Sequence, residues 1–323
     1  MVALHTTDDA VGGPERRVGC STVARRLGES LAGTAPARTT RWLLVEHPGP
    51  WPLDPVDVAA GEAGAVLRRA EAAGIRVQLI RRPAHRRRTS PHQVYAACTS
   101  GPVPWLEGRE LVSLEELAAL DVDALAAGRS PGLGAPVDGP VYLVCTHGRR
   151  DACCAEFGRP VAASVGRTQD AVWETTHLGG DRFAASAVCF PHGLYFGRLD
   201  PDAGPVVAAA YARGEVVLAH YRGRSGTPEV HQVAEHHVRH QTGVLGVADV
   251  EIESSTGSPA RTGMIVRARD RRFRVVVETA EGDVRRRLTC RAAADGCAPV
   301  RRVVEFTELV DPIRPGVLAA TAT

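Results

Sequence analysis

Two short apolar runs, each followed by a residue that binds metals, constrain the fold of this chain more than any other feature. Val141–Val144 predicts a buried strand, bounded by Pro140 and Gly148, with Cys145 where the strand becomes a loop. Ala171–Trp173 predicts a second strand, which ends near His177. Two candidate ligands therefore follow the first strand, and two more follow the second.

A helix is predicted between these strands, over residues 151–165. Asp151 can cap it, because a short carboxylate at a helix start accepts hydrogen bonds from free backbone N–H groups. Cys153 and Cys154 both lie in its first turn. Since neighbouring side chains on a helix point about 100° apart, both cannot easily bind one metal ion.

Cysteine and histidine ligands at strand ends suit an iron–sulfur cluster, in which thiolates bind iron and histidine can replace a thiolate. The glycines of Leu178-Gly179-Gly180 allow backbone N–H groups to approach the sulfide. From the residues alone, a zinc site and buried structural thiols remain alternatives.

Three runs carry a resemblance to a known family: C-T-H-G-R-R-D-A-C-C, H-L-G-G-D-R-F-A-A and P-H-G-L-Y-F-G-R. The chain resembles the sucrase/ferredoxin-like family, a branch of the thioredoxin-like [2Fe–2S] ferredoxins. The resemblance is strongest over residues 137–217 and weaker around Leu43–Trp51. It implies an α/β, thioredoxin-like fold, and "sucrase" in the name implies no sugar chemistry.

The resemblance also implies a ligand set for the [2Fe–2S] cluster. The family's two cysteines separated by eight residues correspond to Cys145 and Cys154, which leaves Cys153 as a packing residue or spare thiol. The family's second pair, separated by three residues, corresponds to His177 and Asp181. Aspartate departs from the histidine or cysteine of the pattern, and a carboxylate is a harder ligand. Cys189, His192 or water remain alternatives for the fourth position.

The function implied by this resemblance is that of an electron carrier, not a catalyst, with a redox partner protein as donor and acceptor. Imidazole in place of thiolate removes negative charge, and Asp181 restores one charge. We therefore expect a potential above all-cysteine ferredoxins and below clusters with two histidines. The alternatives are a thiol–disulfide redox protein using Cys153 or Cys154, although Cys-x-x-Cys is absent, and a zinc-stabilised binding module.

The order of predicted elements suggests a repeated architecture. Residues 41–127 predict strand, helix, strand, two further strands and a helix, and residues 141–213 predict the same order. Ser113 and Glu116 predict a capping box in the first unit. We expect two tandem thioredoxin-like units with a small α+β region after them. The expected division is 1–40 flexible, 41–129 a degenerate unit, 137–217 the ferredoxin unit, 218–314 the α+β region and 315–323 a tail.

Composition excludes several classes of function. Net charge is +2, no apolar run approaches the ~20 residues of a membrane span, and no signal peptide is evident, which favours a cytoplasmic protein. All 39 basic residues are arginine and asparagine is absent, which indicates a GC-rich bacterial genome. The basic run Arg81–Arg88 lacks aromatic residues for base stacking, so we expect a solvated loop or a docking site for an acidic redox partner, not a nucleic-acid site.

Other polar residues are interpreted as structural. His147, Arg149 and Arg150 predict a solvated loop beside the cluster, with donation to the cluster or partner docking as the alternative. His236 and His240 share a face of a helix over Val230–His240, read as a solvated or core-edge helix. Cys290 and Cys297 lie across a loop and could pair or bind zinc, but two unaccompanied cysteines favour ordinary thiols.

Overall fold

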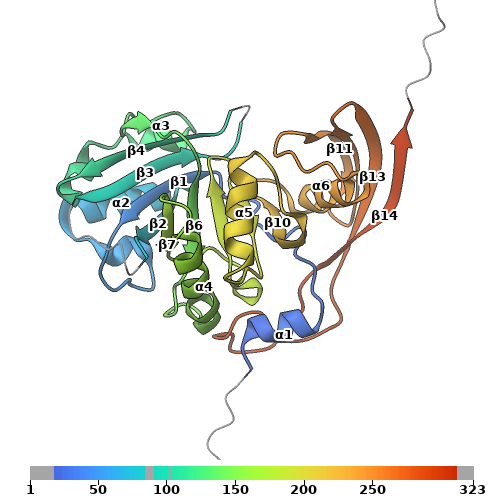
Figure 1. Ribbon diagram of the computed structural model, residues 1–323, viewed down its shortest axis with the longest axis horizontal. Coiled ribbons are helices and arrows are strands. Elements are labelled where there is room, and N and C mark those ends of the chain that lie inside the picture. Colours follow the sequence, from blue (N-terminus) through green and yellow to red (C-terminus); the bar gives the residue numbers. More distant parts are fainter. Residues whose placement is uncertain (1–17, 84–90, 102, 311–323) are drawn as a thin grey trace, which may run out of the picture.

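The protein is a mixed α/β structure with two sheets (Figure 1). The computed structural model describes residues 18–83, 91–101 and 103–310. The larger sheet has ten strands in the order β10-β9-β8-β6-β7-β2-β1-β3-β4-β5, and the smaller has four in the order β11-β12-β13-β14. None of the helices among these residues is both long and apolar enough to cross a membrane.

One half of the large sheet comes from residues before 127. Its strands are β1 (Arg41–Glu46), β2 (Arg76–Arg81), β3 (His92–Cys98) and β4 (Trp105–Leu111). β1 runs parallel to β2 and antiparallel to β3, and the spatial order is β2-β1-β3-β4. Helix α2 (Gly61–Ala72), the 3-10 helix η3 (Leu114–Ala119) and α3 (Val122–Ala126) cover one face of this half.

The other half repeats this arrangement. Its strands are β6 (Val141–Cys145), β7 (Val172–Thr175), β8 (Ala187–Phe190) and β9 (Leu194–Phe196), with α4 (Ala152–Val165) and α5 (Ala203–Ala212) on one face. β6 runs parallel to β7 and antiparallel to β8, in the spatial order β7-β6-β8-β9. The antiparallel pair β2–β7 joins the halves, and the short strands β5 (Ala135–Pro136) and β10 (Tyr221–Arg224) extend the two edges.

The large sheet curls, so the faces that α2 and α4 leave uncovered pack against each other. The Trp42 ring from β1 meets the Phe190 ring from β8 at 5.1 Å between centroids, and Tyr95 from β3 meets Trp173 from β7 at 6.0 Å. This central core also contains Cys145 and Cys154. The two halves therefore share one hydrophobic core, whose burial stabilises both.

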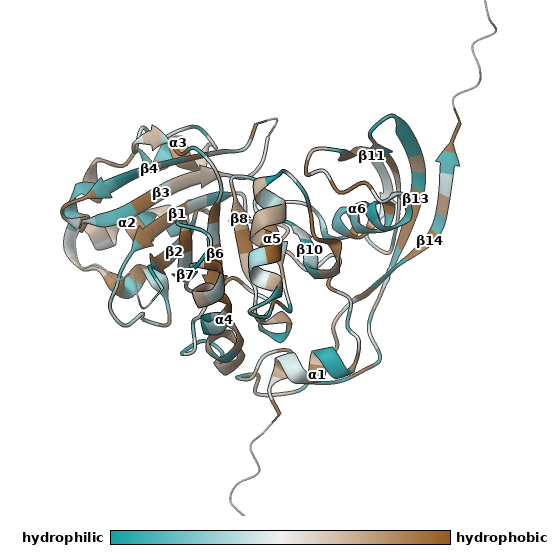
Figure 2. Ribbon diagram, viewed as in Figure 1, coloured by the Kyte–Doolittle hydropathy of each residue, from teal (hydrophilic) through white to brown (hydrophobic). Residues whose placement is uncertain are grey.

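The small sheet belongs to the C-terminal part of the chain and is packed by one helix. Strands β11 (Val250–Ser258), β12 (Arg261–Ala268), β13 (Arg271–Ala280) and β14 (Val300–Leu309) form an antiparallel meander. Alternation along β12 turns its apolar side chains toward α6 (Glu229–Thr242) and the shared core of this region. Figure 2 shows both hydrophilic and hydrophobic residues along the strands of this sheet.

Several predicted elements differ in the structure. β4 begins at Trp105, ahead of the predicted Glu110, and β10 was not predicted. The helix predicted near 114–127 is two pieces, because Leu120 is extended and Asp121 caps a new helix by accepting from the N–H of Ala124. The predicted capping box of Ser113 and Glu116 is present.

The sequence predicts a flexible segment over residues 1–40, of which the structure describes residues 18–40, and these described residues pack against the rest of the protein. Helix α1 (Cys20–Arg26) and the residues after it bury Cys20, Ala24 and Leu31. Figure 1 shows α1 beside the segment that links β13 to β14, so two segments far apart in the sequence meet at one place.

Candidate metal centre

The structure brings the four sequence-predicted ligands together. Cys145 ends β6, Cys154 lies in the first turn of α4, and His177 follows the parallel strand β7; their ligand atoms all lie within 4.8 Å of one another. Asp181 completes the set, with its Oδ1 3.3 Å from Cys154 Sγ and 2.9 Å from His177 Nδ1. We call these four residues the Cys145 site.

The geometry of the site follows from its strands. β6 and β7 are parallel and pair Cys145 with Thr175, so the loops that leave their carboxyl ends emerge at the same edge of the sheet. Asp151 caps α4 by accepting from the N–H of Cys153, as predicted. The cap fixes where the helix begins, and hence where Cys154 points.

The Cys145 site is buried except at His177. Cys145, Cys154 and Asp181 are each at most 5 % exposed, whereas the side chain of His177 is 25 % exposed. Cys154 and His177 hold the pKa of the Cys145 thiol well below its usual range, against the effect of burial. Burial disfavours the imidazolium, but Asp181 and Cys145 outweigh it and raise the pKa of His177 to about 9. The site therefore stabilises a thiolate, the form that binds metals.

Donors from both halves of the sheet hold the loop between His177 and Asp181. The carbonyl of His177 accepts from Arg76 Nη2 at 2.6 Å and Gln78 Nε2 at 3.1 Å, both on β2. The carbonyl of Leu178 accepts from the Tyr195 hydroxyl, and that of Gly179 accepts from Arg222 Nη1 at 3.1 Å. Three consecutive carbonyls are thus fixed before any metal binds. Arg76, Gln78 and Arg222 were not predicted from the sequence, because no local pattern marks them.

Gly158 lets α4 approach the end of β6. A Cβ at this position would lie 2.0 Å from the carbonyl oxygen of Cys145, a contact that cannot be relieved by rotating a side chain.

Gly158→Ala is therefore expected to destabilise the protein by about 1–3 kcal/mol, the usual range for overpacking, although alanine alone favours a helix by ~1 kcal/mol. Urea unfolding measures the change. The control is Gly204→Ala in α5, where the Cβ would lie 3.0 Å from methyl groups of Val161 and Val165 that can shift. A Gly158→Ala protein as stable as the control would contradict the close packing of α4 on Cys145.

The alternatives to Asp181 lie elsewhere. Cys189 is on β8 in the core under α4 and α5, and burial raises the pKa of its thiol. His192 Nδ1 lies 2.7 Å from the hydroxyl of Tyr211. Neither belongs to the group of Cys145, Cys154 and His177.

The loop after Cys145 is not uniformly solvated, contrary to the prediction. Arg149 and Arg150 are exposed, but His147 is 2 % exposed and packs edge-on against Trp51 at 5.9 Å. His177 faces a surface hollow of about 480 Å³, whose lining includes His147, Arg76 and Arg150. A metal bound at the Cys145 site would therefore lie close to solvent on the His177 side.

The basic run before β3 is described only in part, because residues 84–90 lie outside the described residues. Arg81 pairs with Glu174 at 2.8 Å and stacks over Trp51, and Arg82 stacks over Trp173 at 3.8 Å. These two arginines therefore contribute to packing as well as carrying positive charge.

Of the histidines on α6, His237 packs against Phe306 with ring centroids 5.0 Å apart.

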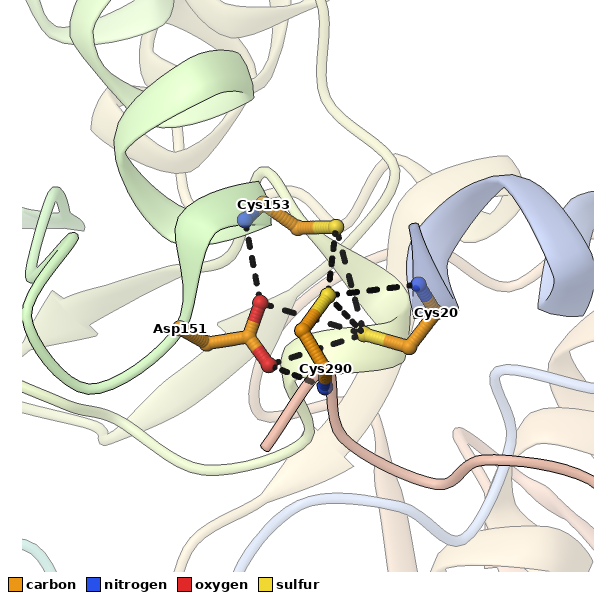
Figure 3. A group of neighbouring side chains, drawn as sticks. All are labelled: Cys20, Asp151, Cys153 and Cys290. Carbon is orange, nitrogen blue, oxygen red and sulfur yellow. Dashed lines mark hydrogen bonds between the residues drawn. The ribbon is translucent and has the colours of Figure 1, made fainter. Parts of the chain in front are cut away.

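A second group of ligand-type residues was missed by the sequence analysis. Cys20, Asp151, Cys153 and Cys290 also have ligand atoms within 4.8 Å of one another (Figure 3), and we call them the Cys20 site. Cys153 is thus not an isolated spare thiol, and Cys290 lies with these residues. Because Cys20 and Cys290 lie far apart in the sequence, no local sequence pattern indicates this group. All eight cysteines are free thiols in the structure.

Comparison with known proteins gives a match to a protein family. A family model described as sucrase/ferredoxin-like matches residues 31–223. No match was found among curated proteins or among solved structures. The matched range contains the whole Cys145 site, whereas Cys20 and Cys290 lie outside it.

Proposed function

The chain belongs to the sucrase/ferredoxin-like family, and from this premise we propose that it is an electron-transfer protein carrying one [2Fe–2S] cluster on the Cys145 site. The observation that carries the proposal is the convergence of two buried thiols and one partly exposed imidazole from separate loops. A bound [2Fe–2S] cluster would accept and release one electron. We also propose that the two halves of the large sheet, with their repeated strand order, are thioredoxin-like units, of which the second binds the cluster.

The donor set fits this cofactor. Cys145 and Cys154 supply soft thiolates on the buried side, and His177 and Asp181 supply an imidazole and a carboxylate on the outer side. The separations are short, however: a core of two irons and two sulfides needs these side chains to move apart from their 4.8 Å grouping. A site for a single metal ion is the alternative that these separations favour.

The outer side of the site suits an acidic redox partner. His177 is the exposed ligand, and Arg76 and Arg150 line the hollow that it faces. Positive side chains around an exposed redox centre attract a negatively charged protein and orient it. The guanidinium of Arg76 also donates to the carbonyl of His177. Arg76 therefore both lines the proposed docking surface and fixes the position of a ligand.

Metal analysis of anaerobically purified protein tests the proposed function. We expect about two irons and two acid-labile sulfides per chain, with visible charge-transfer absorption and an electron paramagnetic resonance signal after reduction. Cys145→Ser should abolish all three, whereas Cys189→Ser, which replaces a thiol in a different core, should retain them. One metal ion without sulfide would establish the single-ion alternative instead.

Asp181→His tests the fourth ligand. Replacing a carboxylate by a neutral imidazole removes one negative charge, so the reduced state is less disfavoured and the potential should rise, on the order of 100 mV. A redox titration monitored by visible absorption measures it. His192→Gln, which changes the rival histidine, should leave the potential unchanged. A higher potential in His192→Gln, or an unchanged potential in Asp181→His, would contradict the assignment of Asp181 as the fourth ligand.

A further inference from the structure

The Cys20 site has a shape that fits a tetrahedral metal ion. The sulfur of Cys20 lies 3.9 Å from that of Cys153 and 3.5 Å from that of Cys290, and the last two are 3.4 Å apart (Figure 3). Zinc–sulfur bonds of about 2.3 Å in tetrahedral geometry separate two sulfurs by about 3.8 Å. The three sulfurs therefore already form the face of a tetrahedron of the right size.

Asp151 supplies the fourth corner. Its Oδ2 lies 3.7 Å from Cys20 Sγ and accepts from the N–H of Cys290 at 2.7 Å, while Oδ1 accepts from the N–H of Cys153 at 2.9 Å. A carboxylate has about four acceptor positions, so each oxygen retains one for a metal. Asp151 is fully buried, and its hydrogen-bond partners among the described residues are N–H and S–H groups, not cations. A buried carboxylate without a counter-charge is costly, and a cation at this position relieves the cost.

The backbone around the sulfurs is also arranged for thiolates. The N–H of Cys20 donates to Cys290 Sγ at 3.4 Å. Gly19 has no Cβ, which would lie 2.7 Å from Cys153 Sγ. Close approach of the N-terminal segment to α4 therefore depends on this glycine.

We propose that the Cys20 site binds one Zn²⁺ ion, which joins α1 and the segment between β13 and β14 to the first turn of α4. Three thiolates and one carboxylate are ligands that Zn²⁺ accepts, and a closed tetrahedral set is typical of structural zinc. The segment from 281 to 299 contains neither helix nor strand apart from the bridge between Arg286 and Gly296. Its other anchors include the ion pair of Arg286 with Glu29. Zinc at Cys290 fixes this segment, and zinc at Cys153 fixes the helix that also carries Cys154.

Elemental analysis of the full chain, prepared without chelators or air, tests the proposal. We expect about one zinc per chain besides the iron of the Cys145 site. Cys290→Ser should lower zinc affinity, measured by competition with a chromophoric chelator, by at least tenfold. The matched control is Cys297→Ser, a partly buried thiol of the same segment outside the site. Cys145→Ser should lose iron and keep zinc, which separates failure of this proposal from failure of the proposed electron carrier.

Two further measurements keep the proposal testable if a variant is unstable. Chelation of zinc from the wild-type protein should speed trypsin cleavage after Arg287 and Arg291, because the segment around Cys290 loses its anchor. Gly19→Ala keeps all four ligands yet should weaken zinc binding. Unchanged zinc affinity in both Cys290→Ser and Gly19→Ala, iron in place of zinc at this site, or a disulfide at Cys290 in anaerobic protein would each overturn the proposal.

Discussion

Cys154→Ser and Cys153→Ser are expected to remove different metals, although the two residues are neighbours. Cys154 Sγ lies 3.3 Å from Asp181 in the Cys145 site, whereas Cys153 Sγ lies 3.4 Å from Cys290 Sγ in the Cys20 site. The 100° between consecutive helical side chains sends them to separate sites. We expect Cys154→Ser to lower the affinity for iron by about tenfold or more and to leave zinc binding unchanged. Cys153→Ser should lower the affinity for zinc and leave iron binding unchanged. Elemental analysis and visible absorption measure both losses.

The control for this pair is Cys98→Ser, which makes the same change at a buried thiol outside both sites. It should retain iron and zinc, because Cys98 Sγ contacts Ser100 and neither group of ligands. Loss of both metals in each single variant would mean that the two cysteines act as one site. Separate losses would explain why the helix begins with two adjacent cysteines.

Local chemistry explains why part of the fold and of the Cys145 site was predictable. The apolar run of β6, the Asp151 cap of α4 and the capping box of Ser113 each depend on residues close in sequence. The spacing of Cys145 and Cys154 belongs to the same strand and helix. Once β6 and β7 are parallel neighbours, the loops after them must meet, and His177 and Asp181 follow.

Contacts between distant segments were not predictable. Nothing in the residues near Cys20 or Cys290 indicates that they meet, since one lies in a seven-residue helix and the other in an irregular segment. The two halves of the large sheet are joined where β2 pairs with β7, and only two residues of each strand take part: Ile80 pairs with Thr175 and Arg81 with Glu174. The burial of His147 depends on Trp51 from the first half. Such features depend on how distant segments pack together, which no single stretch encodes.

The buried Arg222 illustrates how distant contacts support the site. It is 1 % exposed and donates to the carbonyls of Thr34 and Gly179 and to the hydroxyl of Ser186. Its guanidinium therefore ties the segment before β1 to the loop between His177 and Asp181. Burial lowers the pKa of Arg222 to about 10, so the side chain remains charged at neutral pH and its hydrogen bonds are charge-assisted.

Arg222→Met is expected to lower the free energy of unfolding by about 2–4 kcal/mol, because two partly buried carbonyls lose a charged donor, and also to release iron. The matched control is Arg239→Met: Arg239 is equally buried on α6 but donates to the carbonyls of Val244 and Gly246, far in sequence from the Cys145 site. Because Arg239 also pairs with the buried carboxylate of Glu235 at 2.9 Å, this variant should lose at least as much stability and yet keep its iron. Urea unfolding and iron content, measured on both variants below the unfolding transition, separate a general loss of stability from a loss of ligand position. Equal iron in the two variants would show that the carbonyl of Gly179 needs no donor for the site to bind metal.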